Sequence, residues 1–130
     1  MSKESLKIVS EVYEALARRD LPALMELIDS KIVVSQTELL PWGGEYLGFE
    51  GIQQFFSELY RVIDSQLAVE EFVDVGDRVI VIGFTQGRVK ATGAMFNIRA
   101  VHIWTVIGSR AVRFESHVDT PKMLEVLKRE

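Results

Sequence analysis

The 130-residue sequence contains no cysteine, only three prolines and only two histidines. The absence of cysteine excludes disulfide frameworks, thiolate zinc sites and cysteine nucleophiles. No apolar run approaches the length of about 20 residues that a membrane-spanning helix needs, so we expect no membrane partner. Acidic residues outnumber basic residues by 19 to 15, which gives a net charge of −4. This charge disfavours contact with a phosphate backbone, so we expect no nucleic-acid partner.

The composition is that of a globular protein, with 48% hydrophobic and 26% charged residues. The length predicts a single domain over residues 1–130. Charged residues, among them Lys3, Glu4 and Lys7, interrupt any apolar segment at the N-terminus. A secretory signal peptide needs such a segment, so we expect a cytoplasmic protein.

Helical patterns precede strand patterns along the chain. Apolar spacing predicts a first helix from Ser2, a second beginning at Asp20-Leu21-Pro22, a third over Phe49–Ile63 and a short last helix after Asp119-Thr120-Pro121. A short strand is expected at Ile32–Val34, and proline and glycine predict an irregular segment over residues 39–48. Hairpin signals separate strands near 66–74, 78–90, 95–106 and 110–118. This order predicts an α+β protein with a mostly antiparallel sheet.

Alternation along the last two strands predicts which side chains face the core. Phe114, Ser116 and Val118 share the apolar face of the last strand. Ala100, His102 and Trp104 share the apolar face of the strand before it. We therefore expect His102 to face the apolar interior, with Ser116 on the same side of the neighbouring strand.

Four runs of sequence, Tyr13–Leu21, Pro41–Ile52, His102–Val106 and Phe114–Thr120, resemble the SnoaL-like branch of the nuclear transport factor 2-like superfamily. This superfamily is also called ketosteroid isomerase-like or cystatin-like. The resemblance implies a cone-shaped, curved sheet wrapped around three N-terminal helices, with a short C-terminal helix. It also implies a pocket for an apolar or hydroxylated small molecule, and a homodimer.

The best-known catalytic sets of related families do not carry over. The similarity to ketosteroid isomerases would place their tyrosine, base and buried acid at Val12, Ser35 or Gln36, and His102. The similarity to limonene epoxide hydrolases would place their arginine and two aspartates at Ala100, His102 and Ser116. None of these positions keeps the required residue type, so neither chemistry is expected.

Four residues are the candidates for catalysis, and each also has a purely structural interpretation. His102 could serve as an acid or base near neutral pH, or be a hydrogen-bonded core histidine. Ser116 could orient His102 or a ligand, or simply fill space. Tyr13 could reach the pocket or a backbone carbonyl. Asp119 is the one acid at the inward end of the sheet to which the resemblance could assign the acidic base of SnoaL-like polyketide cyclases, and it could instead cap the last helix.

The remaining candidates would contact a ligand. Trp42 and Tyr46 lie in an apolar loop that could be a lid over a ligand or a plug in the mouth of the cone. The two histidines, His102 and His117, fall on opposite strand faces, so we expect no metal site. No phosphate-binding motif is present, so no cofactor is expected. The other expected ligand-binding residues are Gln36, Phe55, Phe56, Leu59, Tyr60, Phe84, Arg88, Trp104, Phe114 and Val118.

Three functional hypotheses follow from these observations. The first is a small-molecule-binding protein with an apolar pocket that acts as a cofactor-free isomerase, cyclase, dehydratase or hydrolase through His102. The second is a ligand-binding protein without catalysis, and the third is an interaction subunit whose pocket is filled. All three hypotheses are compatible with a homodimer, because the outer sheet face mixes apolar and charged residues as a homodimer interface does. That face carries Asn97, Arg99, Val101, Ile103, Arg113, Glu115 and His117.

Overall fold

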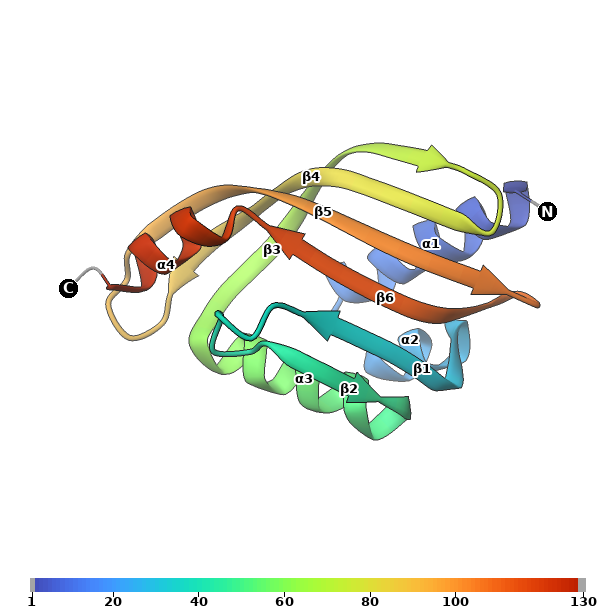
Figure 1. Ribbon diagram of the computed structural model, residues 1–130, viewed down its shortest axis with the longest axis horizontal. Helices are drawn as coiled ribbons and strands as arrows, with labels where there is room; N and C mark the ends of the chain where they lie inside the picture. The colour runs from blue at the N-terminus through green and yellow to red at the C-terminus, as the bar shows by residue number, and fades with distance from the viewer. Residues whose placement is uncertain (1, 129–130) are drawn as a thin grey trace.

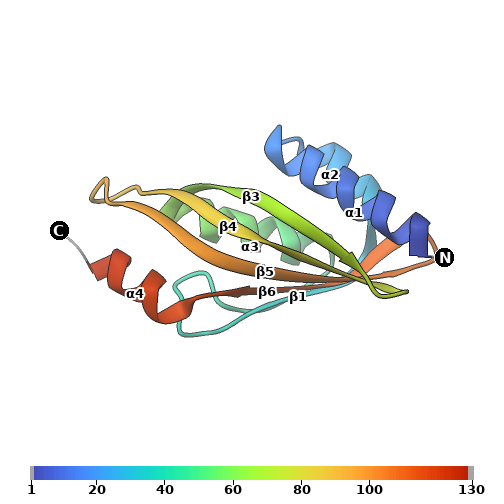
Figure 2. The same ribbon diagram turned by 90° about the horizontal axis from the view of Figure 1, so that it is seen from above.

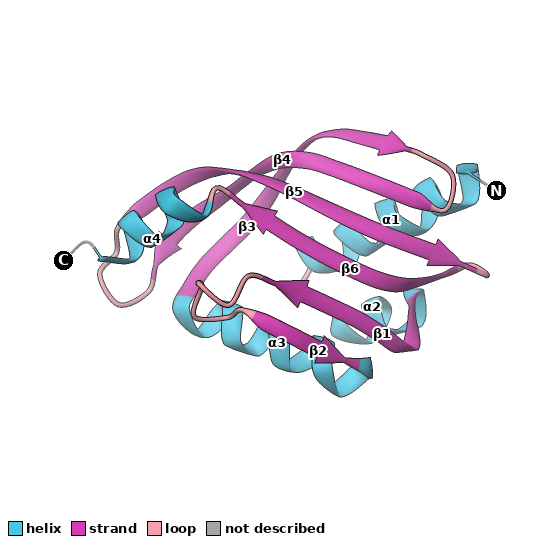
Figure 3. Ribbon diagram, viewed as in Figure 1, coloured by secondary structure: helices cyan, strands magenta, loops and turns pink. Residues whose placement is uncertain are grey.

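A computed structural model describes residues 2–128 of the chain. Four helices and six strands make up this part of the protein (Figures 1 and 3). In chain order they are α1 (Ser2–Ala17), α2 (Leu21–Leu27), β1 (Ile28–Gln36), β2 (Gly44–Leu47), α3 (Gly48–Val62), β3 (Ile63–Asp74), β4 (Arg78–Val89), β5 (Met95–Ile107), β6 (Arg110–Val118) and α4 (Thr120–Lys128). The α+β class is therefore confirmed.

The six strands form one curled, unclosed sheet in the order β2-β1-β6-β5-β4-β3. Only the β1–β6 pair is parallel; the other four pairs are antiparallel. Helices α1, α2 and α3 lie on one side of the sheet, and α4 follows the end of β6 and lies beside the first part of β5 (Figure 2). The expected sheet wrapped around three N-terminal helices is thus present. None of the helices within residues 2–128 is long and apolar enough to cross a membrane.

Two glycines on the inner face of β4 allow the close crossing of β3. A Cβ atom at Gly83 would lie 2.2 Å from the carbonyl oxygen of Ala68. A Cβ atom at Gly87 would lie 1.9 Å from the carbonyl oxygen of Asp64. Both distances are far inside van der Waals contact, so only glycine permits this curl of the sheet. The curl bends β3 over α1 and α3 and so forms one wall of the interior.

The expectation of an irregular segment over residues 39–48 is wrong for its second half. Gly44–Leu47 forms β2, an edge strand that pairs with β1 through Val34–Tyr46 and Gln36–Gly44. Gly44 and Gly48 have φ values of +128° and +75° and bracket the strand. The glycines therefore set the two ends of a strand instead of preventing one, because the residues between them adopt extended backbone.

The alternation in β5 and β6 places side chains as predicted. Ala100, Trp104, Phe114 and Ser116 are buried, whereas His117 is exposed. Register pairs Trp104 with Phe114 and His102 with Ser116 across the two strands. The inner face of the sheet therefore carries both an aromatic stack and a polar pair.

Candidate functional site

A cavity of about 130 Å³ lies between the inner face of the sheet and helices α1 and α3. Several aromatic side chains line it, and the rings of Phe55 and Phe114 meet edge to face at 5.9 Å. The interior is therefore not completely filled. The predicted site residues that line the cavity are Tyr13, Gln36, Trp42, Phe55, Phe56, Leu59, Tyr60, His102, Phe114, Ser116 and Val118.

A second group of lining residues was not predicted from the sequence. Most of them come from the curl of β3 and β4, whose inner face could not be recognised because β4 is apolar on both faces. Gly83, Thr85 and Gly87 are the small residues of β4 that alternate on its inner face, and they are the signal that could have identified it. The missed lining residues are Leu16, Ala17, Ile63, Ser65, Gln66, Leu67, Thr85 and Met123.

Three predicted site residues lie away from the cavity because of strand register or packing. Phe84 pairs with Arg99 on the outer face, where the Arg99 guanidinium lies 4.1 Å from the centre of the Phe84 ring. Arg88 is on the same outer face, 3.9 Å from a carboxylate oxygen of Asp64. Trp104 is fully buried behind the wall of the cavity.

Asp119 also lies outside the cavity wall and makes the bonds of a helix cap. Its side chain accepts a hydrogen bond from the backbone N–H of Lys122 at 3.4 Å. Its carbonyl accepts another from the N–H of Met123 at 3.0 Å. These contacts stabilise the start of α4, as its position before Thr120 and Pro121 predicts.

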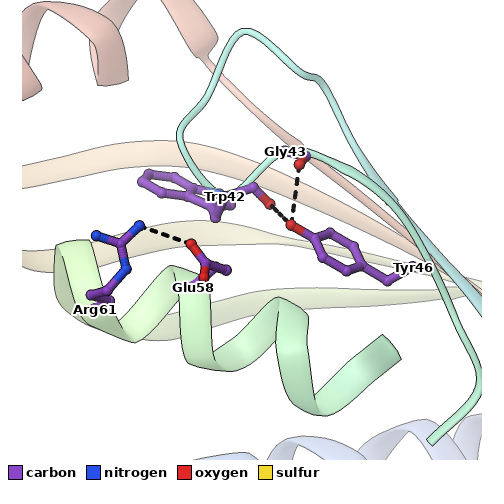
Figure 4. A network of polar contacts seen from close by, with 5 residues as sticks. All are labelled: Trp42, Gly43, Tyr46, Glu58 and Arg61. Atoms are coloured by element: carbon purple, nitrogen blue, oxygen red, sulfur yellow. Dashed lines mark hydrogen bonds and ion pairs between the residues drawn. The ribbon is translucent and has the colours of Figure 1, made fainter. Parts of the chain in front are cut away.

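Tyr46 fastens the loop that carries Trp42. Its hydroxyl lies 3.1 Å from the carbonyl oxygen of Trp42 and 3.1 Å from that of Gly43, so it donates to both (Figure 4). Trp42 itself is buried and forms part of the cavity wall. Tyr46 therefore acts on the cavity indirectly, by holding Trp42 in place. The nearby pair of Arg61 and Glu58, also drawn in Figure 4, joins two residues one turn apart on α3.

A chain of three side chains holds His102 in position. The indole N–H of Trp104 donates to the hydroxyl oxygen of Tyr13 at 2.8 Å. The same hydroxyl lies 2.6 Å from Nδ1 of His102. Because an indole nitrogen can only donate, the Tyr13 oxygen is the acceptor in the first bond. We assign the Tyr13 proton to the second bond, since Nδ1 of His102 is the one acceptor that this hydroxyl contacts among the residues described. Nδ1 is then an acceptor, and the ring proton resides on Nε2.

Burial keeps both members of this pair neutral. It lowers the pKa of His102 to about 3, with a smaller contribution from the charge of His117. Burial also raises the pKa of Tyr13, against a small opposing effect of the Trp104 hydrogen bond. At neutral pH the His102 ring therefore offers the cavity a neutral N–H donor, while its basic nitrogen is occupied by Tyr13.

Three polar side chains form a row across the inner face of the sheet. His102 on β5 is the direct register partner of Ser116 on β6. On the other side, Ser35 of β1 pairs with Glu115 of β6. Gln36 follows Ser35 on β1, and Ser116 follows Glu115 on β6. Because the two strands are parallel, the side chains of Gln36 and Ser116 lie next to each other on the inner face. We call Gln36, Ser116 and His102 the polar row.

The polar row has unused donors. The side-chain nitrogen of Gln36 is enclosed and has no hydrogen-bond partner, the one such atom among the side chains described, those of residues 4–128. Nε2 of His102 has no protein partner among these residues either. The ring that carries this nitrogen lines the cavity. A buried unpaired donor costs about 1–3 kcal/mol, and a ligand oxygen would remove that cost.

The cavity wall carries no Asp, Glu, Lys or Arg among the residues that the structure describes. The remaining titratable residue of the wall is Tyr60. Burial raises the pKa of Tyr60, the charge of Arg19 lowers it, and the charge of Asp64 raises it. No group of three His, Asp or Glu side chains within residues 2–128 is arranged to hold a metal ion. The site is thus a mainly apolar cavity without Asp, Glu, Lys or Arg in its wall, with the polar row along one side and further polar side chains at Ser65, Gln66 and Thr85.

Comparison with known proteins agrees with this architecture. The sequence profile of the SnoaL-like domain matches residues 9–114. A nuclear transport factor 2-like protein of unknown function from Burkholderia pseudomallei K96243 is 28% identical, with a TM-score of 0.90 over 97% of this chain and 98% of that chain. TerC, co-crystallised with polyporic acid, is 25% identical, with a TM-score of 0.88 over 97% and 99% of the two chains.

A more distant structure shares only the fold. A candidate SnoaL-like polyketide cyclase from Jannaschia sp. CCS1 is 13% identical, with a TM-score of 0.88 over 99% of this chain and 94% of that one. No curated protein matches the sequence.

Proposed function

Because this chain belongs to the SnoaL-like domain family, we propose that it binds a small apolar molecule in the cavity between the sheet and helices α1 and α3. The ligand would be an uncharged aromatic compound with a carbonyl or hydroxyl oxygen. The observation that carries this proposal is the polar row. It lines a mainly apolar cavity with His102, whose Nε2 has no protein partner among the residues described, and with Gln36, whose enclosed side-chain nitrogen would have to turn toward the cavity to reach a ligand.

The dimensions and charge of the cavity define the ligand class. A volume of about 130 Å³ is close to that of apolar protein cavities of about 150 Å³ that accept benzene. It therefore suits one ring and its oxygen substituent. A charged ligand group would be desolvated there without an ionic partner, which is strongly unfavourable.

The same groups define what catalysis the cavity supports. The donors of His102 and Gln36 would polarise a carbonyl and stabilise negative charge that develops on its oxygen. The cavity wall has no carboxylate to remove a proton, and Nδ1 of His102 is occupied by Tyr13. The arrangement therefore favours ligand binding, with carbonyl polarisation as the one catalytic contribution of the side chains. The co-crystal of the similar protein TerC with polyporic acid supports the binding of a small organic molecule.

The test compares acetophenone with α-methylstyrene, which replaces the carbonyl oxygen with a methylene of similar shape. Dissociation constants would be measured for the wild-type protein and for Gln36→Leu and His102→Leu. We expect each variant to weaken acetophenone relative to α-methylstyrene by about threefold to tenfold, the effect of one hydrogen bond. An unchanged ratio in both variants, or no binding of acetophenone to the wild type, would refute the proposal.

A second proposal concerns the outer sheet face, which we propose pairs with a second copy of the chain. Val101 and Ile103 on this face remain partly exposed, and Arg113 lies 3.5 Å from Glu115 beside them. Such a mixture of apolar surface and paired charges suits a self-complementary interface. Light scattering should give the mass of a dimer for the wild type and of a monomer for Ile103→Glu. A monomeric wild type would refute this proposal.

A further inference from the structure

A second cavity, of about 270 Å³, lies beside the first, between the end of α1, helix α2 and helix α3. The two cavities share three wall residues, Leu16, Phe56 and Tyr60. The other walls of the second cavity include the buried apolar side chains of Ala15 and Leu24, together with polar residues at the rim. Only side chains of α1 and α3 therefore belong to both cavities, and no strand of the sheet contributes to the second.

We propose that the two cavities are subsites for one elongated ligand. This inference rests on the proposed function. The ring and its oxygen would occupy the first cavity against the polar row, and an uncharged apolar tail would pass Tyr60 into the second. The first cavity holds little more than one ring. The second is about twice as large and, like the first, is lined mainly by apolar side chains.

Arg19 holds the partition between the two subsites. Its guanidinium carbon lies 3.7 Å from the centre of the Tyr60 ring, within the range of a cation–π contact. The same guanidinium donates to the carbonyl oxygen of Ser65 at 2.9 Å and lies 3.6 Å from a carboxylate oxygen of Asp64. Tyr60 is thus held by a residue of the α1–α2 connection, and a ligand tail would have to pass beside this ring.

The charges at the second cavity are already paired, which defines the chemistry of the tail. Arg19 is engaged by Asp64 and Ser65. Asp20 lies 3.5 Å from Arg18, and its side chain accepts a hydrogen bond from the first turn of α2. With both charges occupied, the second cavity favours an alkyl or aryl tail over a tail that ends in a carboxylate or phosphate.

A series of phenyl alkyl ketones, from acetophenone to octanophenone, tests this inference. In the wild-type protein each added methylene that enters the second cavity should tighten binding by about threefold to fourfold. Ser57→Trp would fill the second cavity from an exposed position of α3, and Gln53→Trp would do so from another. Gln54→Trp is the matched control, since Gln54 is exposed on the same helix and lines neither cavity.

The expected result is that Ser57→Trp and Gln53→Trp weaken octanophenone by about tenfold or more, and leave acetophenone within about twofold of wild type. Gln54→Trp should change neither. Ser57→Trp and Gln53→Trp each fill the second cavity, so the test can still be made if one of the two variants does not fold. If the wild type binds acetophenone but its affinity does not rise with tail length, or if the filling variants bind octanophenone normally, the second subsite is refuted and the proposed function stands. If no ketone binds, both are refuted.

Discussion

The hydroxyl of Tyr13 on α1 lies 2.6 Å from Nδ1 of His102 on β5. The two residues are 89 positions apart in the sequence, and the contact joins the first helix to the centre of the sheet. The indole of Trp104 donates to the same hydroxyl, and we assign the Tyr13 proton to the bond with Nδ1 of His102, the one acceptor that this hydroxyl contacts among the residues described. This relationship makes His102 a hydrogen-bond donor toward the cavity.

The first prediction concerns the tautomer of His102. Nitrogen-15 NMR should show Nδ1 unprotonated and Nε2 protonated, with no titration of this ring between pH 8 and pH 4, because its pKa is lowered to about 3. In Tyr13→Phe, Trp104 and His102 both lose their partner, and the free energy of unfolding should fall by about 1–3 kcal/mol. A ring that is protonated on Nδ1, or that titrates near pH 6.5, would contradict the assignment.

The second prediction concerns stability against pH. The unfolded chain binds a proton at His102 below pH 6.5, whereas the folded protein does so only below about pH 3. Within this window the unfolded state binds more protons, so the free energy of unfolding falls as the pH falls. The slope from this residue should approach about 1.4 kcal/mol per pH unit.

Chemical denaturation of the wild type and of His102→Leu between pH 7.5 and pH 3.5 measures that slope. Other acidic groups titrate in both proteins, so the difference between the two curves isolates His102. The difference should be flat above pH 6.5 and should change below it. Parallel curves over the whole range would mean that His102 is equally protonated in the folded and unfolded states.

The third prediction concerns Gln36, whose side-chain nitrogen is enclosed without a partner. Replacing Gln36 by Leu removes an unpaired polar group from an apolar wall, so the free energy of unfolding should rise by about 1–3 kcal/mol. Gln66→Leu is the control, because Gln66 lines the same cavity but is exposed. Its effect should stay within about 0.5 kcal/mol. A less stable Gln36→Leu protein would mean that the amide has a structural role in the folded chain.

Much of the fold follows from the sequence where one face of an element is clearly apolar. Alternation in β5 and β6 placed His102, Ser116 and Phe114 on the inner face. Alternation does not identify the inner face of β4, because Phe84 continues an apolar pattern on the outer face of this strand. The outer position of Phe84 and Arg88 is decided by the pairing of β4 with β5, and pairing is not encoded in one strand alone.

The candidate site could be predicted only in part, for a related reason. Tyr13 and His102 each follow from a local pattern, but their contact depends on how α1 crosses the sheet. The position of Gln36 beside Ser116 depends on the parallel pairing of β1 with β6, which joins segments that are far apart in the chain. The second cavity likewise arises from three helices packing together, and no single segment carries a signal for it.

The last prediction concerns Gly43, which allows the Trp42 loop to close. A Cβ atom at this position would lie 1.8 Å from the carbonyl oxygen of Thr37 and 2.7 Å from Cα of Glu38. Both contacts are with backbone, so Gly43→Ala must displace the loop together with Trp42 and the hydrogen bonds of Tyr46. We expect the free energy of unfolding to fall by about 2–4 kcal/mol, near the upper range for single substitutions.

Denaturation curves and tryptophan fluorescence would measure this effect, because Trp42 would leave its buried position in the cavity wall. Leu39→Ala is the control in the same loop, since Leu39 is 70% exposed and should cost about 0.5 kcal/mol or less. The variant should also bind acetophenone more weakly than the control does, because Trp42 forms part of the first subsite. A Gly43→Ala protein with wild-type stability and emission would show that the loop tolerates a side chain there, and that Trp42 is held independently of it.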